Sequence, residues 1–252
     1  MPGKLLTLEG VRKAFGAHKV LDGIDLGIET SEIVGLLGPN GSGKSTLLNV
    51  ISGFMSLDAG QVSIEGRAIS RLPADAVVKA GLVRTFQLPS MPTRMTVREV
   101  LQAGSSGGAG VRSWFARPRF DADLDSLLDQ FKLSHVADLP ASALSGGQKK
   151  LLSIATALRA HPRLLCLDEP TAGVHPELRT EIVNILRACN AQGVTILVVE
   201  HDMMFIRDLC RRAVVLDRGE LIADCAPKDL ESNPRVVEAY LGKAVKKGKV
   251  RT

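Results

Sequence analysis

The stretch Gly38-Pro39-Asn40-Gly41-Ser42-Gly43-Lys44-Ser45-Thr46 decides the fold of this chain, because it fits the pattern G-x-x-x-x-G-K-[ST]. An apolar run at residues 32–37 precedes it, and an apolar segment at 44–51 follows. The first run predicts a buried parallel strand and the second a helix. A strand, a glycine-rich turn and a helix in this order predict a loop that binds the phosphates of a nucleoside triphosphate.

The residue types in this loop suit a polyphosphate. Gly38, Gly41 and Gly43 carry no Cβ, so the backbone can take positive φ and turn successive N–H groups toward phosphate oxygens. The helix that follows adds unpaired N–H groups and the positive end of its dipole. Lys44 supplies a positive charge, and Ser45 a hydroxyl for Mg²⁺. We therefore expect the whole stretch from 38 to 46 to bind the phosphates.

Length and composition are those of a single compact domain. The chain has 252 residues, of which 45% are hydrophobic, and this is enough to bury a large core. No apolar segment approaches the roughly 20 residues that span a bilayer. Residues 1–5 also lack the apolar stretch of a secretion signal. We expect a protein that is cytosolic or peripheral to a membrane.

Cysteine spacing and charge narrow the class of protein further. The four cysteines lie far apart, without the spacing of metal ligands, so we expect reduced thiols at Cys166, Cys189, Cys210 and Cys225. The net charge is +5, but residues 243–252 hold five cations and no acid, which leaves the rest formally neutral. We expect this basic tail to be disordered and solvated, with contact to anionic lipid as the alternative.

The periodicity of apolar residues changes along the chain. Residues 5–35 and 60–72 alternate apolar and polar, which predicts antiparallel strands. Residues 96–160 have helical spacing, and strand, helix and strand follow after 160. This order predicts an α/β fold: a parallel sheet around the phosphate loop, an antiparallel β-subdomain and an inserted helical subdomain. We expect residues 1–90 and 160–242 to form the core with its β-subdomain and 91–159 the insertion, all within one domain of 1–252.

Polar residues follow two further apolar runs. Residues 164–167 end in Asp168 and Glu169, and residues 195–199 are followed by Glu200 and His201. Near a phosphate loop, Asp168 can hold Mg²⁺ directly or through water, and Glu169 can accept a proton from the attacking water. A neutral imidazole at His201 can bind the γ-phosphate and orient the water or Glu169.

A second glycine-rich turn, Leu144-Ser145-Gly146-Gly147-Gln148, lies before a helix that begins near residue 149. It predicts another helix N-terminus that binds an anion. One nucleotide does not need two such sites on the same protomer. We therefore expect a partner to share them.

Together these motifs resemble the ATP-binding cassette (ABC) ATPases over nearly the whole chain. Residues 38–45 look like Walker A, 144–148 like the signature and 164–169 like Walker B, with Gln87 as the Q-loop glutamine and His201 as the switch histidine. The resemblance implies ATP and Mg²⁺ as ligands, with Ser45, Gln87 and Asp168 holding the metal and Phe15 stacked on the adenine. Lys44, Glu169 and His201 would be the catalytic residues.

The resemblance also implies a head-to-tail dimer with an identical or paralogous subunit. Residues of the signature in one protomer would then bind the ATP held by Lys44 of the other, namely Ser145, Gly146, Gly147 and Gln148. One position departs from the family pattern, because His175 stands where many relatives carry Asp or Asn. The resemblance implies that this loop lines the dimer seam, and our hypothesis is that His175 makes closure sensitive to pH.

Three segments look like the ATP-binding subunits of branched-chain amino acid importers: residues 84–87, residues 200–203 and residues 234–242. Such a subunit would lie on the cytoplasmic face of a bacterial inner membrane, bound to two permease subunits and indirectly to a periplasmic binding protein. The alternatives are the ATPase of a lipopolysaccharide-export system and a soluble ABC ATPase of iron–sulfur cluster assembly. The basic and aromatic residues between 112 and 120 are expected to pack within the insertion or to contact a membrane subunit rather than nucleic acid.

Overall fold

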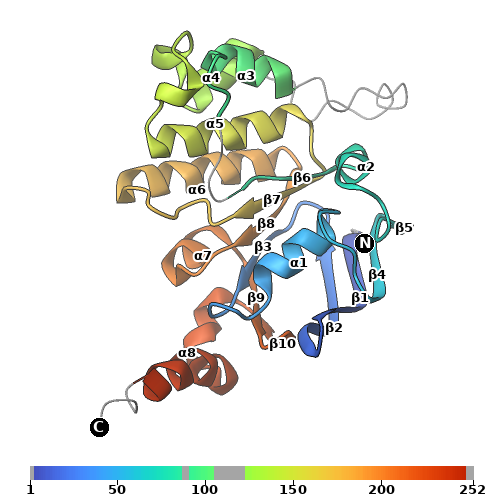
Figure 1. Cartoon of the computed structure of the whole chain (residues 1–252). Helices are drawn as coiled ribbons and strands as arrows, with labels where there is room; N and C mark the ends of the chain where they lie inside the picture. Colours follow the sequence, from blue (N-terminus) through green and yellow to red (C-terminus); the bar gives the residue numbers. More distant parts are fainter. Residues whose placement is uncertain (1–2, 87–90, 105–122, 248–252) are drawn as a thin grey trace.

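The computed structural model describes residues 3–86, 91–104 and 123–247, with side chains described as far as Tyr240. A six-stranded sheet lies at its centre, in the order β10-β9-β3-β8-β7-β6 (Figure 1). Its strands are β3 (Ile33–Leu37), β6 (Leu82–Arg84), β7 (Leu164–Asp168), β8 (Thr195–Val199), β9 (Arg212–Asp217) and β10 (Glu220–Cys225). Every neighbouring pair is parallel except β9 and β10, which confirms the predicted parallel sheet.

A second, antiparallel sheet has the order β2-β1-β4-β5. It contains β1 (Lys4–Phe15), β2 (His18–Glu29), β4 (Ala59–Ile64) and β5 (Arg67–Ala68). Alternate side chains of these strands are buried and exposed, as the period of two in the sequence predicted. One face of this sheet therefore packs on the molecule, and the other faces solvent.

The helices form layers on both sides of the central sheet (Figure 1). Between the two sheets lies α1 (Lys44–Ile51), and α2 (Ala74–Lys79) leads into β6. The opposite face is covered by α3 (Val97–Gly104), α4 (Leu124–Gln130), α5 (Gly146–Arg159), α6 (Pro176–Ala191) and α7 (Met203–Leu209). The described chain also contains three short 3₁₀ helices, η3 (Ser134–Val136), η4 (Ala141–Ala143) and η5 (Pro227–Ser232). It ends in the helix α8 (Pro234–Lys247).

The central sheet separates two hydrophobic cores, and β7 contributes to both. Leu164 and Cys166 pack with α1 and the antiparallel sheet, whereas Leu165 and Leu167 pack with the helical layer. This strand is apolar without alternation because both of its faces are buried. Each of these leucines contributes about 1.5–3 kcal/mol of burial free energy.

The end of the chain differs from the expectation. The basic segment 243–252 was predicted to be disordered, but α8 continues to Lys247, so residues 243–247 are helical. Pro234 starts this helix, and no glycine or proline interrupts the chain between Gly242 and Gly248, which explains why the helix extends into the basic segment. In the part of the chain that is described, no helix is both long and apolar enough to cross a bilayer.

Candidate nucleotide-binding and catalytic site

Three parallel strands bring the predicted site residues to one edge of the central sheet. The N–H of Glu169, which follows β7, donates to the carbonyl of Val199 at the end of β8 over 2.9 Å. The N–H of Glu200 in turn donates to the carbonyl of Leu36, near the end of β3, over 3.2 Å. The phosphate loop, Glu169 and His201 therefore all leave the carboxyl edge of the sheet side by side, where α/β proteins bind their ligands.

Glycine is required at the three loop positions for different structural reasons. A Cβ on Gly38, whose φ is 155°, would come within 2.1 Å of the carbonyl oxygen of Leu216 in β9. A Cβ on Gly43, with φ 110°, would come within 2.8 Å of the carbonyl oxygen of Val20 in β2. A Cβ on Gly41 would meet open space, and only its φ of 79° favours glycine there. Two of the glycines thus let the loop pack against neighbouring strands, while the third lies open.

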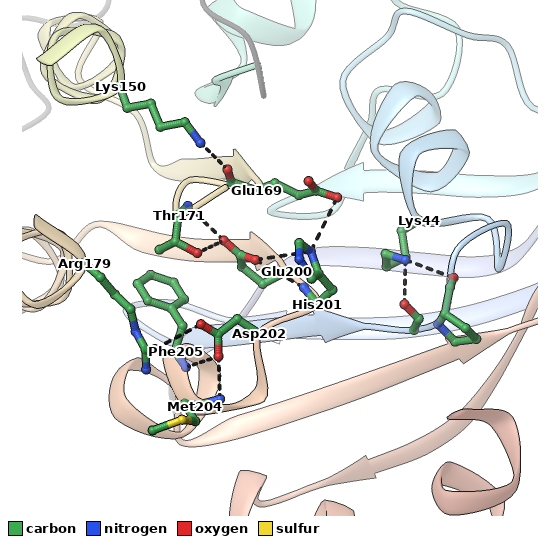
Figure 2. A network of polar contacts seen from close by, with 12 residues as sticks. Lys44, Lys150, Glu169, Thr171, Arg179, Glu200, His201, Asp202, Met204 and Phe205 are labelled. Atoms are coloured by element: carbon green, nitrogen blue, oxygen red, sulfur yellow. Dashed lines mark hydrogen bonds and ion pairs between the residues drawn. The ribbon is translucent and has the colours of Figure 1, made fainter. Parts of the chain in front are cut away.

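Lys44 folds back over its own loop. It is 8% exposed, and its Nζ donates to the carbonyls of Gly38 over 2.7 Å and Pro39 over 3.1 Å (Figure 2). At the start of α1, the N-cap residue Gly43 offers no side chain to the first N–H groups of the helix. Orphan N–H groups, an open glycine and a lysine ammonium at one helix N-terminus fit the phosphates of a nucleotide.

Ser42 contributes to this loop differently from its neighbours. Its side chain is buried, and its Oγ would meet a Cβ on Gly38 at 2.6 Å, so it lies under the loop. Ser45 is exposed and Thr46 half-buried at the helix start. The hydroxyl of Ser42 is enclosed by Gly38, and its backbone is engaged as well: its N–H donates to the carbonyl of Pro39 over 3.1 Å, and its carbonyl accepts the N–H of Gly219 over 3.0 Å.

Asp168, the predicted metal ligand, is paired with a residue that sequence reasoning did not assign a role. The Nη2 of Arg84 lies 2.8 Å from Oδ2 of Asp168, and both side chains are largely buried. Its Nη1 donates to Asn49 Oδ1 over 2.7 Å and to Ser52 Oγ over 3.3 Å. Arg84 thus ties β6, α1 and β7 together at the base of the site. The only sequence signal was a charged residue after the short apolar pair Leu82-Val83.

Glu169 and His201 face one another across the strand ends. Nδ1 of His201 lies 3.8 Å from Oε1 of Glu169 and 3.8 Å from Oε2 of Glu200 (Figure 2). Glu169 has a φ of 45°, a left-handed conformation that costs on the order of 1–3 kcal/mol for a residue other than glycine. Surrounding contacts must stabilise this conformation, which aims the carboxylate toward His201.

Glu200 supplies several of these contacts, and sequence reasoning did not recognise its role. It is fully buried and accepts hydrogen bonds from the N–H of Thr171 over 2.9 Å and from Thr171 Oγ1 over 2.5 Å. Its other oxygen accepts the N–H of His201 over 3.2 Å. Glu200 therefore holds the loop after β7 and the turn after β8 in one arrangement. An acid directly after a buried strand was the available signal.

The turn that carries His201 ends in a strong helix cap. Asp202 Oδ1 accepts hydrogen bonds from the N–H groups of Met204 over 2.8 Å and Phe205 over 3.1 Å (Figure 2). Its Oδ2 accepts a hydrogen bond from Nη1 of Arg179 over 3.0 Å. An aspartate cap stabilises a helix start by roughly 1 kcal/mol. The position of His201 is thus set by Glu200 before it and Asp202 after it.

The second glycine-rich turn starts α5 with a capping box. Ser145 Oγ accepts the N–H of Gln148 over 3.3 Å, and Gln148 Oε1 accepts the N–H of Ser145 over 3.0 Å. A Cβ on Gly147 would come within 2.4 Å of Leu178 in α6, whereas one on Gly146 would meet open space. Since α5 and α1 pack in different cores, the structure places this turn and the phosphate loop of one chain in different layers.

Comparison with known proteins identifies the family. The model of the ABC transporter family matches residues 21–172. The chain belongs to the ABC transporter ATPases. It is 37% identical to a probable branched-chain amino acid transport ATP-binding protein, LivG, of Methanocaldococcus jannaschii, over 95% of this chain and 98% of that one. It is 34% identical to the lipopolysaccharide export system ATP-binding protein LptB of Haemophilus influenzae, over 96% of this chain and 99% of that one.

Solved structures agree with the family. The ADP conformation of an ATP-binding cassette of an ABC transporter has a TM-score of 0.83 and 36% identity, covering 95% of this chain and 99% of that chain. The predicted α/β phosphate-loop fold is thereby confirmed. The chain is the ATPase subunit of an ABC transporter, and it binds and hydrolyses ATP.

Two further residues were predicted to bind ATP in this ABC ATPase. Phe15 is 51% exposed at the end of β1, and the Nζ of Lys13 lies 5.7 Å from the centre of its ring. The paired strand β2 brings Val20 against Gly43, so the hairpin that carries Phe15 adjoins the phosphate loop. An exposed aromatic ring beside the loop suits stacking on a base. Gln87 lies outside the described residues.

The cysteine side chains of the ABC ATPase are poorly ionised at neutral pH. Burial raises the pKa of the Cys166, Cys189 and Cys210 thiols to about 12, and it also raises that of Cys225. All four are free thiols. Within the described residues, no group of His, Cys, Asp and Glu side chains could hold a metal by itself.

Proposed function

We propose that this ABC ATPase energises a bacterial importer for branched-chain amino acids or related small solutes. Support comes from its relatives, since LivG of Methanocaldococcus jannaschii and BraF of Pseudomonas aeruginosa are branched-chain amino acid transport proteins by name. The second is 31% identical over 97% of this chain. The observation that carries the catalytic part is the meeting of the phosphate loop, Glu169 and His201 at one sheet edge.

A role in lipopolysaccharide export is the second candidate. The likeness to LptB of Haemophilus influenzae favours it, at an identity only slightly lower than that to LivG. Neither of these relatives supports the iron–sulfur alternative. The two transport functions share one ATPase mechanism and differ in the membrane subunits that the ATPase would meet.

In the proposed mechanism, the N–H groups of residues 38–46 and the ammonium of Lys44 bind the phosphates of ATP. Ser45, Asp168 and Gln87 would hold Mg²⁺, which neutralises charge on the phosphoryl oxygens. Because Arg84 occupies Oδ2 of Asp168, this aspartate would engage the metal through its other oxygen or through water. Phe15 would stack on the adenine.

Glu169 is the proposed general base. It would accept a proton from the attacking water, and His201 would orient that water and bind the γ-phosphate. The separation of 3.8 Å between the two side chains leaves them close enough to act on one water. Their strand ends are tied by backbone hydrogen bonds, so the pair needs little rearrangement before reaction.

The proposed assembly is a head-to-tail dimer with an identical or paralogous subunit. Residues 145–148 lie in a different layer from the phosphate loop of their own chain, which favours binding to the nucleotide of the partner. The permease subunits would dock near Phe54 and Phe86, whose exposed rings lie 5.5 Å apart, because Phe86 directly precedes Gln87. This arrangement would place the subunit on the cytoplasmic face of the inner membrane, with a periplasmic binding protein as an indirect partner.

Uptake in the native host tests the proposed function. A strain that lacks this gene is complemented with the wild-type chain or with Lys44→Ala, and uptake of radiolabelled leucine is measured. We expect the wild type to restore uptake and Lys44→Ala to fail, because the loss of the ammonium removes tight ATP binding. Normal leucine uptake in the deletion strain, together with defective lipopolysaccharide export, would favour the second candidate instead.

A further inference from the structure

Lys150 connects the helix behind the signature to the end of β7. It lies in the second turn of α5, and its Nζ donates to the carbonyl oxygen of Glu169 over 2.9 Å (Figure 2). The same carbonyl accepts the N–H of Ala172 over 3.2 Å. Two donors therefore fix the peptide group of Glu169, whose φ is 45°.

The charges around Lys150 favour an ammonium group at this position. Burial lowers the pKa of its ammonium, while the carboxylates of Glu200 and Glu169 oppose that shift. Glu200 is fully buried and holds Thr171, two residues beyond Glu169. The ammonium thus lies among the groups that fix both ends of the turn at residues 169–171, and it balances buried negative charge there.

Little space surrounds the contact. A cavity of about 10 Å³ lies where Lys150 and Ile154 of α5 meet Asp168, Glu169 and the chain after β6. This is about the volume that one water molecule needs. An apolar side chain at position 150 would leave the carbonyl of Glu169 without its ammonium donor.

We propose that Lys150 is a positioning residue that holds Glu169 in its left-handed conformation and joins it to the signature helix. This inference rests on the proposed function, in which Glu169 is the base and residues 145–148 bind the partner's nucleotide. Because α5 begins at Gly146 and carries Lys150 one turn later, a shift of the signature helix moves the side chain that donates to Glu169. Each protomer would thereby sense the nucleotide of its partner at its own catalytic carboxylate.

Lys149 offers a matched control. It has the same charge one residue earlier, and in the part of the chain that is described its side chain makes no hydrogen bond or ion pair. The test compares Lys150→Met, Lys150→Arg and Lys149→Met with the wild type. Amide hydrogen exchange of residues 169–174 is measured without nucleotide, and ATP affinity, kcat and KM are measured in the assembled transporter.

We expect at least tenfold faster exchange at residues 169–174 in Lys150→Met, because the loop opens locally more often. We expect its kcat to fall at least tenfold while KM and ATP affinity stay within twofold. Lys150→Arg keeps a charged donor and should recover most of both losses, and Lys149→Met should match the wild type.

Unchanged exchange in Lys150→Met would overturn the proposal, as would a kcat within twofold of wild type. A parallel tenfold loss of ATP affinity would place Lys150 in the binding machinery and would also overturn it. Should the wild-type transporter hydrolyse no ATP, the proposed function fails, while the exchange experiment still decides whether Lys150 holds Glu169.

Discussion

At the scale of single residues, the three loop glycines make different predictions although they belong to one motif. Gly38→Ala should destabilise the protein by about 3 kcal/mol or more, since its Cβ meets a backbone oxygen and the left-handed strain adds to the overpacking. Gly41→Ala adds a Cβ in open space and should cost only about 1 kcal/mol through its φ. Urea denaturation measures both. Equal losses in the two variants would contradict the packing argument.

Arg84 should be important for stability as well as for the site. Arg84→Met leaves Asp168 buried without its ion-pair partner, which costs about 3–5 kcal/mol in folding free energy. Arg98→Met is the control, because Arg98 pairs with Asp125 at the surface, where ion pairs contribute little to stability. Both values come from chemical denaturation. A loss below about 1 kcal/mol for Arg84→Met would show that Asp168 is well solvated without its partner.

Single charged residues mark the limit of what could be predicted from the sequence at this scale. Glu169 and His201 were identified because each follows a buried strand in a chain with a phosphate loop. Glu200 also follows a buried strand, but nothing in the sequence indicated that it turns inward. Arg84 and Lys150 lack such a signal, and a charge alone is typical of a solvated surface. Their roles follow from burial and from partners between 29 and 84 residues away for Glu200 and Arg84, which only the folded chain reveals.

At the scale of elements, the capping box of α5 combines a structural and a functional role. Ser145→Ala removes the cap and should destabilise the protein by about 0.5–2 kcal/mol. Ser145→Asp keeps a capping oxygen and should restore the melting temperature, yet it should not restore ATP hydrolysis, because it places a negative charge where a phosphate is proposed to bind. Melting temperature and ATPase rate are measured together. Full activity in Ser145→Asp would remove this residue from the proposed shared site.

Elements with a clear period or a motif were predictable. The strand at 195–199 and the helix at 44–51 have the bounds that the sequence indicated. Phe131 was grouped with the helical run but lies just after α4, where it is nevertheless fully buried. The short strands β6 and β10 were not predicted. β6 has only three residues and pairs with the distant β7, and β10 is only partly buried and lacks a clear apolar run.

At the scale of the whole molecule, the shared site predicts a dimer that depends on nucleotide. Glu169→Gln keeps the shape of the side chain but removes a base, so it should bind ATP, lose at least about 100-fold in turnover and accumulate as a dimer with ATP. Light scattering with and without ATP measures the mass, and a nucleotide-binding assay confirms occupancy. Lys44→Ala in the same background is the control and should stay monomeric. Wild-type turnover in Glu169→Gln would exclude Glu169 as the base.

The buried thiols predict how stability depends on pH. Burial holds the pKa of Cys166, Cys189 and Cys210 at about 12 in the folded chain, whereas the unfolded thiols ionise near their ordinary value. Their contribution to the free energy of unfolding is therefore complete below about pH 9. As the pH rises from there toward 12, each thiol lowers this free energy by roughly 1.4 kcal/mol per pH unit. Denaturation at pH 7.5 and 10 measures it. Alanine at all three positions should flatten this part of the profile, and an unchanged slope would contradict the prediction.

The division of the interior by the central sheet has an evolutionary consequence. Side chains on one face of β7 never meet those on the other, so changes of packing on the two faces should be nearly additive in free energy. Mutations that adapt the helical side to a new partner protein can then accumulate without disturbing the strands and the helix α1 on the other side, next to the phosphate loop. A family with this architecture can change the partners of its helical side while keeping the same nucleotide-binding side.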